Sequence, residues 1–225
     1  GDLALVDAAQ VFRMPEALTW EQGAMIEPAA VSWSAVKLGE VGDRDSVLVT
    51  GAGPIGALAA VAADAAGARV LVSEPNVRRG ARVAALGFEV IDPRVIDVVD
   101  ACREWSPGGV DVAIECSGQV PAIQASLAAL RPGGRVVQTG VPVRPTEIDL
   151  ARLMLSGLSI LGSVGYSIRC WPELMGEVAS GALPIDRVLT ARVPIDDAVA
   201  DGFDRLLDPS GDEIKILVDI SGAKE

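Results

Sequence analysis

Residues 47–76 read VLVTGAGPIGALAAVAADAAGARVLVSEPN, and this stretch decides the fold class. The apolar run Val47–Thr50 leads into a glycine-rich turn, an alanine-rich segment begins at Pro54, and a second apolar run covers Arg69–Ser73. Two short apolar runs joined by a helical segment form a β-α-β unit, whose two strands pair in parallel. We therefore expect the chain to build a parallel sheet around this unit.

The glycine-rich turn has the spacing of a dinucleotide-binding motif. Gly51, Gly53 and Gly56 form G-x-G-x-x-G. The first glycine permits the tight turn, the second lets a pyrophosphate approach the backbone, and the third allows close helix packing. Pro54 stands at the expected first position of the helix, where its missing N–H is harmless, and Ile55 completes the turn. The free N–H groups at the start of this helix would face the phosphates.

A glycine turn can also serve only to make room for a helix. Here the turn follows an apolar strand and opens a helix, and Glu74 ends the next strand about 20 residues further on, which favours a dinucleotide. A carboxylate at that position accepts hydrogen bonds from ribose hydroxyls and repels a 2′-phosphate. Arg78 and Arg79 could attract such a phosphate, or could simply face solvent. We predict NAD as the cofactor rather than NADP.

Strands and helices alternate through the middle of the chain. Short β-rich runs separated by helical segments, with Gly and Pro in the turns, indicate a parallel sheet covered on both faces. We predict an α/β fold with a doubly wound parallel sheet, the Rossmann fold. Beyond the opening unit, the expected helices cover Val77–Leu86, the region near Val95–Trp105 and Val120–Leu130, and the expected strands cover Glu89–Ile91, Val110–Glu115, Arg135–Thr139 and Leu158–Val164.

The two ends of the chain do not continue this alternation. Val6–Arg13 has the pattern of a strand with a short connection, and residues 14–39 that of a turn leading into a helix. At the other end, residues 188–220 predict a strand, a helix and a final strand. These flanks are either additions to the central sheet or remnants of a second domain.

The composition limits the partners of the protein. The chain has 225 residues, with 19 Lys or Arg against 31 Asp or Glu and a net charge of −12. This acidic balance opposes binding to nucleic acid or to anionic membrane surfaces. No apolar run approaches the roughly 20 residues needed to cross a bilayer, and we expect no signal peptide. Three widely spaced cysteines fit reduced thiols, so we expect a cytoplasmic protein that binds small molecules.

Several blocks of the sequence resemble one enzyme family in their order and spacing. They are EPAAVSWSAVKLGEVGDRDSVLVTGAGPIG, SEPNVRRGARVAALGFEVIDP, VDVAIECSG, LRPGGRVVQTGVP, LSILGSVGYS and DEIKILVDI. They resemble the medium-chain dehydrogenases, and most of all the zinc-dependent polyol branch with the sorbitol and 2,3-butanediol dehydrogenases. The resemblance covers essentially the whole chain. It implies hydride transfer between a secondary alcohol or polyol and the nicotinamide ring.

The resemblance also implies that the chain is the later part of such an enzyme. In the family, a preceding domain that resembles the chaperonin GroES supplies most ligands of the catalytic zinc. The flanks of the present chain would then be remnants of that domain. The predicted division is residues 1–24 as a remnant and linker, 25–185 as the dinucleotide-binding domain, and 186–225 as a C-terminal return segment.

A zinc ion is expected for the family, but these residues do not assemble its site. A catalytic zinc needs about three protein ligands, and the chain has no histidine and no closely spaced cysteine pair. Glu27 resembles the family glutamate that binds zinc or lies beside it, although a carboxylate near the start of a helix is also favoured by the helix dipole. Ser34 stands where many relatives have a histidine, and its hydroxyl could pass a proton only through water. Glu27 and Ser34 are the candidate catalytic residues.

The resemblance also assigns further cofactor contacts. Arg79 corresponds to an arginine beside the adenine ribose, and Cys116 and Ser117, with Gly118, to the strand end near the second ribose. Gly140 and Val141 correspond to the turn whose backbone faces the nicotinamide, and Ser163 and Val164 to the segment that closes over it. Without the resemblance, each of these residues would be read as part of a strand end or turn, and Cys116 as a small core residue.

The apolar segment Leu158–Val164 carries a prediction about assembly. An unpaired apolar strand at a sheet edge invites association with another chain. In the family, the corresponding edge pairs with its twin across a two-fold axis. We therefore expect a homodimer or a higher assembly, unless a helix or the C-terminal segment covers this edge within the chain.

Two hypotheses about function follow from these observations. The first is the NAD(H)-binding part of an alcohol or polyol dehydrogenase whose zinc and substrate contacts come from another domain. The second is a dinucleotide-binding module that has lost catalysis. The missing ligands and Ser34 favour the second hypothesis for these residues alone, and Glu27 favours the first. The identity of the substrate does not follow from the sequence.

Overall fold

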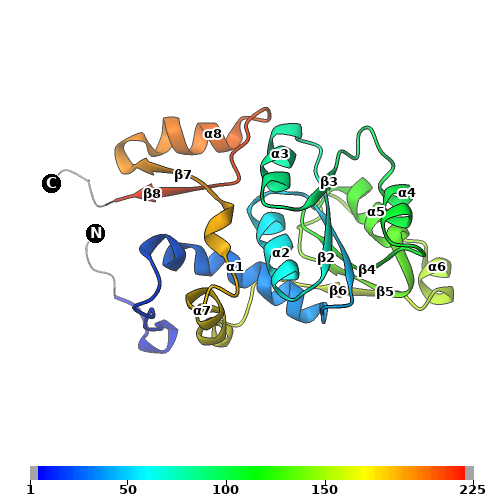
Figure 1. Cartoon of the computed structure of the whole chain (residues 1–225), viewed down its shortest axis with the longest axis horizontal. Coiled ribbons are helices and arrows are strands. Elements are labelled where there is room, and N and C mark those ends of the chain that lie inside the picture. Colours follow the sequence, from blue (N-terminus) through cyan, green and yellow to red (C-terminus); the bar gives the residue numbers. More distant parts are fainter. Residues whose placement is uncertain (1–4, 221–225) are drawn as a thin grey trace.

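A computed structural model describes residues 5–220 and contains a six-stranded parallel sheet in the order β3-β2-β1-β4-β5-β6. From β1 the chain winds outward to β2 and β3, then returns to place β4, β5 and β6 on the other side of β1 (Figure 1). The predicted doubly wound fold is confirmed. The strands are β1 (Ser46–Thr50), β2 (Arg69–Ser73), β3 (Glu89–Ile91), β4 (Val110–Glu115), β5 (Leu130–Gln138) and β6 (Ser159–Gly162).

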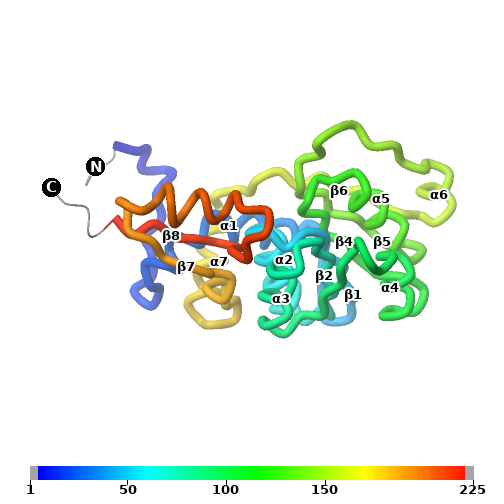
Figure 2. Tube along the Cα trace, turned by 90° about the horizontal axis from the view of Figure 1, so that it is seen from above, coloured from blue at the N-terminus to red at the C-terminus, as the bar shows by residue number. Residues whose placement is uncertain are grey.

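Helices cover both faces of the sheet (Figures 1 and 2). Because side chains alternate along a strand, Val47 and Val49 of β1 join the core on one face and Leu48 joins that on the other. The first core includes α1 (Trp20–Leu38), α2 (Pro54–Ala65) and α7 (Trp171–Ala179), with Val83 of α3 (Val77–Ala85). The second includes α4 (Val98–Trp105) and α5 (Val120–Ala129). The short α6 (Leu150–Leu155) precedes β6.

Most predicted boundaries agree with the structure to within one or two residues, and two differ by more, for local reasons. The helix expected near Val95 starts at Val98, because the Asp97 carboxylate accepts hydrogen bonds from Val99 N and Asp100 N and caps it there. The strand β5 starts at Leu130 rather than Arg135, since Leu130 already pairs with Val110 before a shift in register. Both changes leave the carboxyl ends of the strands in place.

The strand predicted over Val6–Arg13 is wrong. The segment contains a short 3-10 helix, Ala8–Gln10, and Asp7 caps it by accepting a hydrogen bond from Ala9 N at 2.9 Å. A local side-chain acceptor of this kind competes with extended pairing. The helix expected within residues 14–39 is confirmed as α1, where Thr19 and Gln22 form a reciprocal capping box.

The C-terminal strand, helix and strand form a separate small sheet. The strands β7 (Leu189–Pro194) and β8 (Lys215–Asp219) pair in parallel, and both lie at the end of the molecule opposite α6 (Figure 1). A π-helix (Ala198–Phe203) and α8 (Asp204–Leu207) join the two strands. Three further 3-10 turns are Ile168–Cys170, Ile185–Val188 and Ile195–Asp197. The first four residues of the predicted segment 1–24 and the last five of the segment 186–225 lie outside the described residues.

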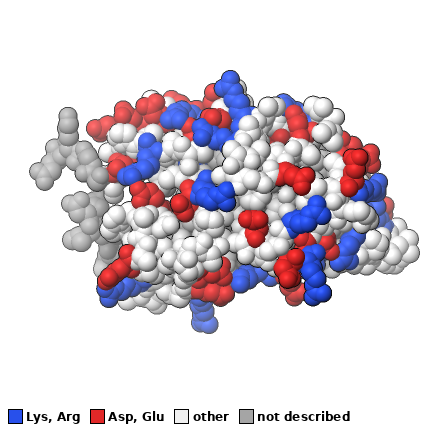
Figure 3. Space-filling model, viewed as in Figure 1, with Lys and Arg blue, Asp and Glu red and all other residues white. Residues whose placement is uncertain are grey.

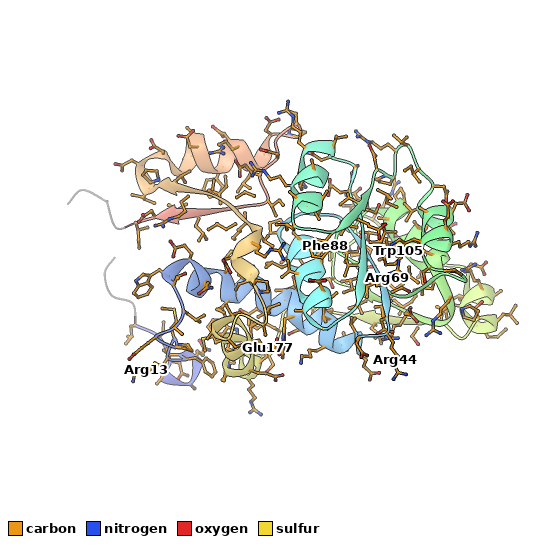
Figure 4. All side chains as sticks on the ribbon, viewed as in Figure 1. Arg13, Arg44, Arg69, Phe88, Trp105 and Glu177 are labelled. Atoms are coloured by element: carbon orange, nitrogen blue, oxygen red, sulfur yellow. The ribbon has the colours of Figure 1, made fainter. Side chains whose placement is uncertain are left out.

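Two side-chain contacts fix helices against their neighbours. Glu177 of α7 lies beside α1 (Figure 4), and its carboxylate accepts a hydrogen bond from Trp33 Nε1 at 2.8 Å. At the start of β2, the Arg69 guanidinium lies 4.4 Å from the ring centre of Trp105 (Figure 4). The first contact orients α1 against α7, and the second holds the end of α4 at the amino end of β2.

Charged side chains of both signs are intermixed over the face shown in Figure 3. Of the helices within residues 5–220, none is long and apolar enough to span a bilayer.

Candidate functional site

The glycine turn after β1 has the geometry that the motif predicts. Gly51 has a φ of +89° and donates from its N–H to Ser73 O at 2.8 Å, which joins the turn to β2. A Cβ on Gly56 would collide with the carbonyl oxygen of Gly51, so α2 can start this close to the turn only with glycine there. A Cβ on Gly53 would meet nothing within 4 Å. The backbone at Gly53 therefore borders open space at the first turn of α2, as a bound pyrophosphate requires.

Glu74 lies directly behind this turn and holds it in place. The side chain is buried, with 4% of its surface exposed. Its carboxylate accepts hydrogen bonds from Ala52 N at 2.6 Å and Asn76 N at 2.8 Å. A carboxylate offers about four acceptor positions, so two remain for other donors. Glu74 is thus a support of the glycine turn, and it keeps the capacity to accept from a ribose.

The start of α3 borders the same end of the sheet. Asn76 caps the helix by accepting from Arg78 N and Arg79 N at 3.0 Å, and its amide donates to Pro209 O and Gly211 O. The Arg79 Nε atom is buried and has no hydrogen-bond partner among the described residues. The charge of Arg78 lies near enough to Asp208 to help lower the pKa of that carboxyl, after the stronger effect of hydrogen bonds from Ser210.

The turns after β4 and β5 touch each other, and the turn after β4 lies directly beside the glycine turn. Gly118 has a φ of +67°, and a Cβ on it would collide with Val141 O. A Cβ on Gly140 would collide with Gly118 N and would lie 2.8 Å from a carboxylate oxygen of Glu115. The Val141 side chain is 85% exposed at this edge. The structure brings together the predicted residues Cys116, Ser117, Gly140 and Val141 on these two turns.

Glu115 is central to these turns, and the sequence interpretation missed it. It ends β4 and is fully buried. Its carboxylate accepts hydrogen bonds from Ser117 N at 2.8 Å, Gly118 N at 3.0 Å and Thr50 Oγ1 at 3.2 Å, and further bonds from Ser117 Oγ and Gln138 Nε2. The signal was available, because VDVAIECSG places an acidic residue at the end of an apolar strand as VLVSEPN does for Glu74.

Cys116 follows Glu115 and is a thiol with little tendency to ionise. Burial raises its pKa far above the usual range, and the nearby charge of Glu115 adds to this effect. Because the thiolate is the reactive form of cysteine, this environment suits a neutral packing residue rather than a nucleophile.

The candidate catalytic residues Glu27 and Ser34 lie two turns apart on α1. Glu27 is exposed, and its carboxylate accepts a hydrogen bond from the Tyr166 hydroxyl at 3.2 Å. Burial, and then Glu27, raise the pKa of Tyr166. Ser34 lies near Cys170, whose pKa is raised by burial against an opposing hydrogen bond with Ser34. Tyr166 and Cys170 are additional polar neighbours that only the tertiary structure identifies.

One hydrogen bond connects α1 to the glycine turn. The buried Ser32 hydroxyl donates to Ile55 O at 2.7 Å. Ser32 lies between Glu27 and Ser34 on the same helix, so the bond fixes the position of the candidate catalytic residues relative to the start of α2. The predicted residue Ile55 therefore links the two parts of the site through its backbone.

The described residues do not form a zinc site. Residues 5–220 contain no cluster of three or more His, Cys, Asp or Glu side chains that could hold a metal ion. Glu27, the ligand that the sequence suggests, has the Tyr166 hydroxyl as its hydrogen-bond partner. Because a catalytic zinc needs about three protein ligands, residues 5–220 would have to be joined by ligands from elsewhere to hold such an ion.

Comparison with known proteins agrees with this architecture. Residues 54–180 match the family model described as zinc-binding dehydrogenase. The chain is 31% identical to the (R,R)-butanediol dehydrogenase of Bacillus subtilis over 95% of its own length and 62% of that enzyme. The crystal structure of the 2R,3R-butanediol dehydrogenase from B. subtilis superposes with a TM-score of 0.87 at 30% identity, over 93% of the chain and 60% of the enzyme.

Two other relatives cover similar regions. The chain is 31% identical to the sorbitol dehydrogenase of Macaca fascicularis, over 86% of the chain and 55% of the enzyme. A Sinorhizobium meliloti 1021 protein assigned to the zinc-binding dehydrogenases, solved with NADP bound, has a TM-score of 0.82 at 32% identity, over 92% of the chain and 61% of that protein. The chain thus spans about three fifths of the length of these proteins.

Proposed function

Because the chain belongs to the family of zinc-binding dehydrogenases, we propose that it is the NAD(H)-binding part of an oxidoreductase acting on a small alcohol or polyol. The observation that carries this proposal is the glycine turn with Glu74 behind it. The turn opens α2 beside the point where the strand order reverses, between β1 and β4. Ligands of doubly wound sheets bind at such a point, outside the carboxyl ends of the strands.

The described residues fit a dinucleotide along this edge. Gly51, Gly53, Pro54 and Gly56 would hold the pyrophosphate against the first turn of α2. Glu74 and Arg79 would bind the adenine ribose. The turns at Cys116–Gly118 and Gly140–Val141 would hold the nicotinamide half. When bound, NAD⁺ would accept the hydride from the carbon of the secondary alcohol while the hydroxyl proton leaves to a base or to water, and the two turns would position the nicotinamide ring.

NAD is the proposed cofactor rather than NADP. The buried Glu74 carboxylate would repel a 2′-phosphate. The positive charge of Arg78 is partly balanced by the nearby Asp208 carboxylate, which reduces the attraction of Arg78 for a 2′-phosphate. Two observations argue for the alternative: the NADP bound to the S. meliloti protein, and the buried Arg79 Nε that lacks a hydrogen-bond partner within residues 5–220. Titration with NADH and NADPH decides between them, and tighter binding of NADPH would contradict the proposal.

Glu27 and Ser34 are proposed as the residues of this chain nearest to the reacting alcohol. Glu27, with Tyr166 donating to it, could accept or orient a proton, and Ser34 could pass one through water. Zinc is proposed only for the whole enzyme, with Glu27 as one ligand and the others supplied from outside residues 5–220. We also propose residues 25–185 as the limits of the dinucleotide-binding domain.

The first test is a titration of NADH followed by its fluorescence. Glu74→Ala should weaken NADH binding by about 1 to 3 kcal/mol, because the variant loses both the ribose acceptor and the support of Ala52 N. Asp64→Ala is a matched control, since Asp64 is an exposed carboxylate near the far end of α2. Unchanged NADH affinity of Glu74→Ala would show that the adenosine half has been misplaced.

A catalytically inactive binding module is the alternative function. The observations that favour it are the absence of histidine from the whole sequence and the serine at position 34. The two functions separate in an assay of NAD reduction with 2,3-butanediol and with sorbitol. Tight NADH binding without turnover in the complete gene product would favour the binding module.

A homodimer through the edge of the sheet completes the proposal. Within the described residues, β6 pairs only with β5, and Ile160 on this edge strand is 39% exposed. We expect β6 to pair with a second copy, and sedimentation of a dilute sample showing only monomer would contradict this. The three free thiols support a reducing, cytoplasmic location.

A further inference from the structure

Glu115 is a buried carboxylate without an assigned role at the carboxyl end of the sheet. Its side chain has no exposed surface. Removal of a carboxylate from water is unfavourable unless hydrogen bonds replace its hydration. The partners of Glu115 therefore show what it stabilises.

The carboxylate of Glu115 is saturated by donors from the protein itself. Oε1 accepts from Thr50 Oγ1, from Ser117 N and Oγ, and from Gly118 N. Oε2 accepts from Gly118 N and Gln138 Nε2. These five donors exceed the roughly four acceptor positions of a carboxylate. Glu115 has no capacity left for a ligand, so any effect on a cofactor must pass through the groups it holds.

Those groups belong to the two turns that face the nicotinamide half of the proposed site. The side chain holds the turn after β4 through Ser117 and Gly118. The backbone carbonyl of Glu115 holds the turn after β5, because it accepts from Thr139 N at 2.8 Å and Gly140 N at 2.7 Å. Gln138 connects the two sets, since its amide donates to the carboxylate and also to Gly140 O at 2.7 Å.

The two turns and the Glu115 carboxylate are packed so closely that only glycine fits at position 140. The Gly140 backbone lies so close to Gly118 N and the Glu115 carboxylate that a Cβ would not fit. If the carboxylate loses acceptor capacity, the buried Gly118 N and the part-buried Ser117 N compete for fewer acceptors, and the turn after β4 is held less firmly against the turn after β5. The glycine turn after β1 touches this region through Thr50 and Gly51, but its Ala52 N is held by Glu74, so we expect it to be affected less.

We propose that Glu115 is a positioning residue for the nicotinamide half of the cofactor and leaves the adenine half unaffected. The inference rests on the proposed function, because it assumes that a dinucleotide binds across the ends of β1, β4 and β5. It adds to that function a division of the site between two buried glutamates. Glu74 serves the half that NADH shares with ADP, and Glu115 serves the half that ADP lacks.

Calorimetric titration of the purified protein with NADH and with ADP tests this division. Glu115→Gln keeps the size of the side chain but replaces one acceptor oxygen by a donor. It should weaken NADH binding about 10- to 100-fold and change ADP binding by less than about threefold. Glu74→Gln is the matched control, and it should weaken both ligands by similar factors. A retained ADP affinity also shows that the Glu115→Gln protein is folded.

A second variant tests the proposal if Glu115→Gln does not fold. Gln138→Met keeps the length of the side chain and the Glu115 carboxylate but removes the link to Gly140 O. It should weaken NADH about 3- to 10-fold, again without a matching loss for ADP. The fluorescence of bound NADH should move toward its value in water in this variant, because the ring is held less firmly.

The possible outcomes separate the inference from the function on which it rests. Equal loss of NADH and ADP affinity in Glu115→Gln, or unchanged NADH affinity in either variant, would overturn the positioning role and leave the proposed function standing. Wild-type protein that binds neither ligand would overturn both. A selective loss of NADH affinity in Glu115→Gln and Gln138→Met supports the division.

Discussion

Glu74 follows β2 and Glu115 ends β4, so each half of the six-stranded sheet carries one buried glutamate at its carboxyl end. Each carboxylate accepts from the N–H two residues later, Asn76 N and Ser117 N, at 2.8 Å in both cases. The two halves differ in how many acceptor positions of the carboxylate remain unused. Glu74 has two protein donors and spare acceptor positions, whereas Glu115 has more donors than positions. A buried glutamate at equivalent places in the two halves can thus either bind a ligand directly or hold the turns that bind it.

The largest expected effect comes from closing the space at the two turns. Gly56→Ala and Gly140→Ala each place a methyl group against backbone, which has no low-energy alternative. Each should reduce the free energy of unfolding by about 3 kcal/mol or more. Gly53→Ala is the control, since its methyl group meets open space. It should leave stability nearly unchanged and weaken NADH binding.

Chemical denaturation of the three proteins measures these effects. If Gly140→Ala were as stable as wild type while Gly56→Ala was not, only the glycine-turn half would depend on close backbone approach. The turns after β4 and β5 would then not need the close backbone approach that the glycine turn needs.

A carboxylate at the other end of β4 provides the next test. Asp111 accepts from Ser46 N at 2.7 Å and Ser46 Oγ at 2.6 Å, and it pairs with Arg131. Burial alone would raise the pKa of Asp111, but the bonds from Ser46 and Arg131 lower it overall. Asp111→Asn should cost about 1 to 3 kcal/mol of stability at pH 7 and leave NADH binding unchanged, in contrast to Glu115→Gln.

The pH dependence of this effect has a defined sign. A carboxyl with a lowered pKa in the folded state stabilises the protein above its unfolded pKa, about 3.9 for Asp. That contribution is lost as the pH falls from this value through the lower folded pKa. The stability difference between wild type and Asp111→Asn should therefore shrink below about pH 4. A difference that stayed constant down to about pH 2 would show that charge on Asp111 is not its cause.

The smallest effect concerns thiol reactivity. Burial, with a lesser contribution from Asp97, raises the pKa of Cys102 to about 12, and burial with the charge of Glu115 also raises the pKa of Cys116. Each unit of raised pKa lowers the thiolate fraction about tenfold, so both thiols should react slowly at about pH 8 in the native protein. NADH should slow Cys116 further and leave Cys102 unchanged.

Alkylation followed by mass spectrometry of the peptides resolves the two residues. Equal protection of Cys102 and Cys116 by NADH would point to general tightening of the fold. Protection of neither would argue against a cofactor half at the turn after β4.

Local sequence was sufficient for most of the sheet because its central strands β1, β2 and β4 are buried on both faces. Runs such as VLVT and VDVAIE have few stable alternatives to a covered parallel strand, and the glycines that separate them mark turns. The prediction of a strand at Val6–Arg13 was wrong because a short apolar pattern does not reveal whether a partner strand exists. There, the Asp7 cap over Ala8–Gln10 decides the conformation instead.

The sequence by itself determined the doubly wound parallel fold, the glycine turn and the acidic residue behind it, because these depend on patterns and spacing along the chain. Only the tertiary structure showed that Glu115 holds two turns, that Tyr166 donates to Glu27, and that Ser32 joins α1 to Ile55. The Tyr166 and Ser32 contacts join residues 139 and 23 positions apart. Contacts across such separations depend on how layers pack, and no periodicity within a single segment contains that information.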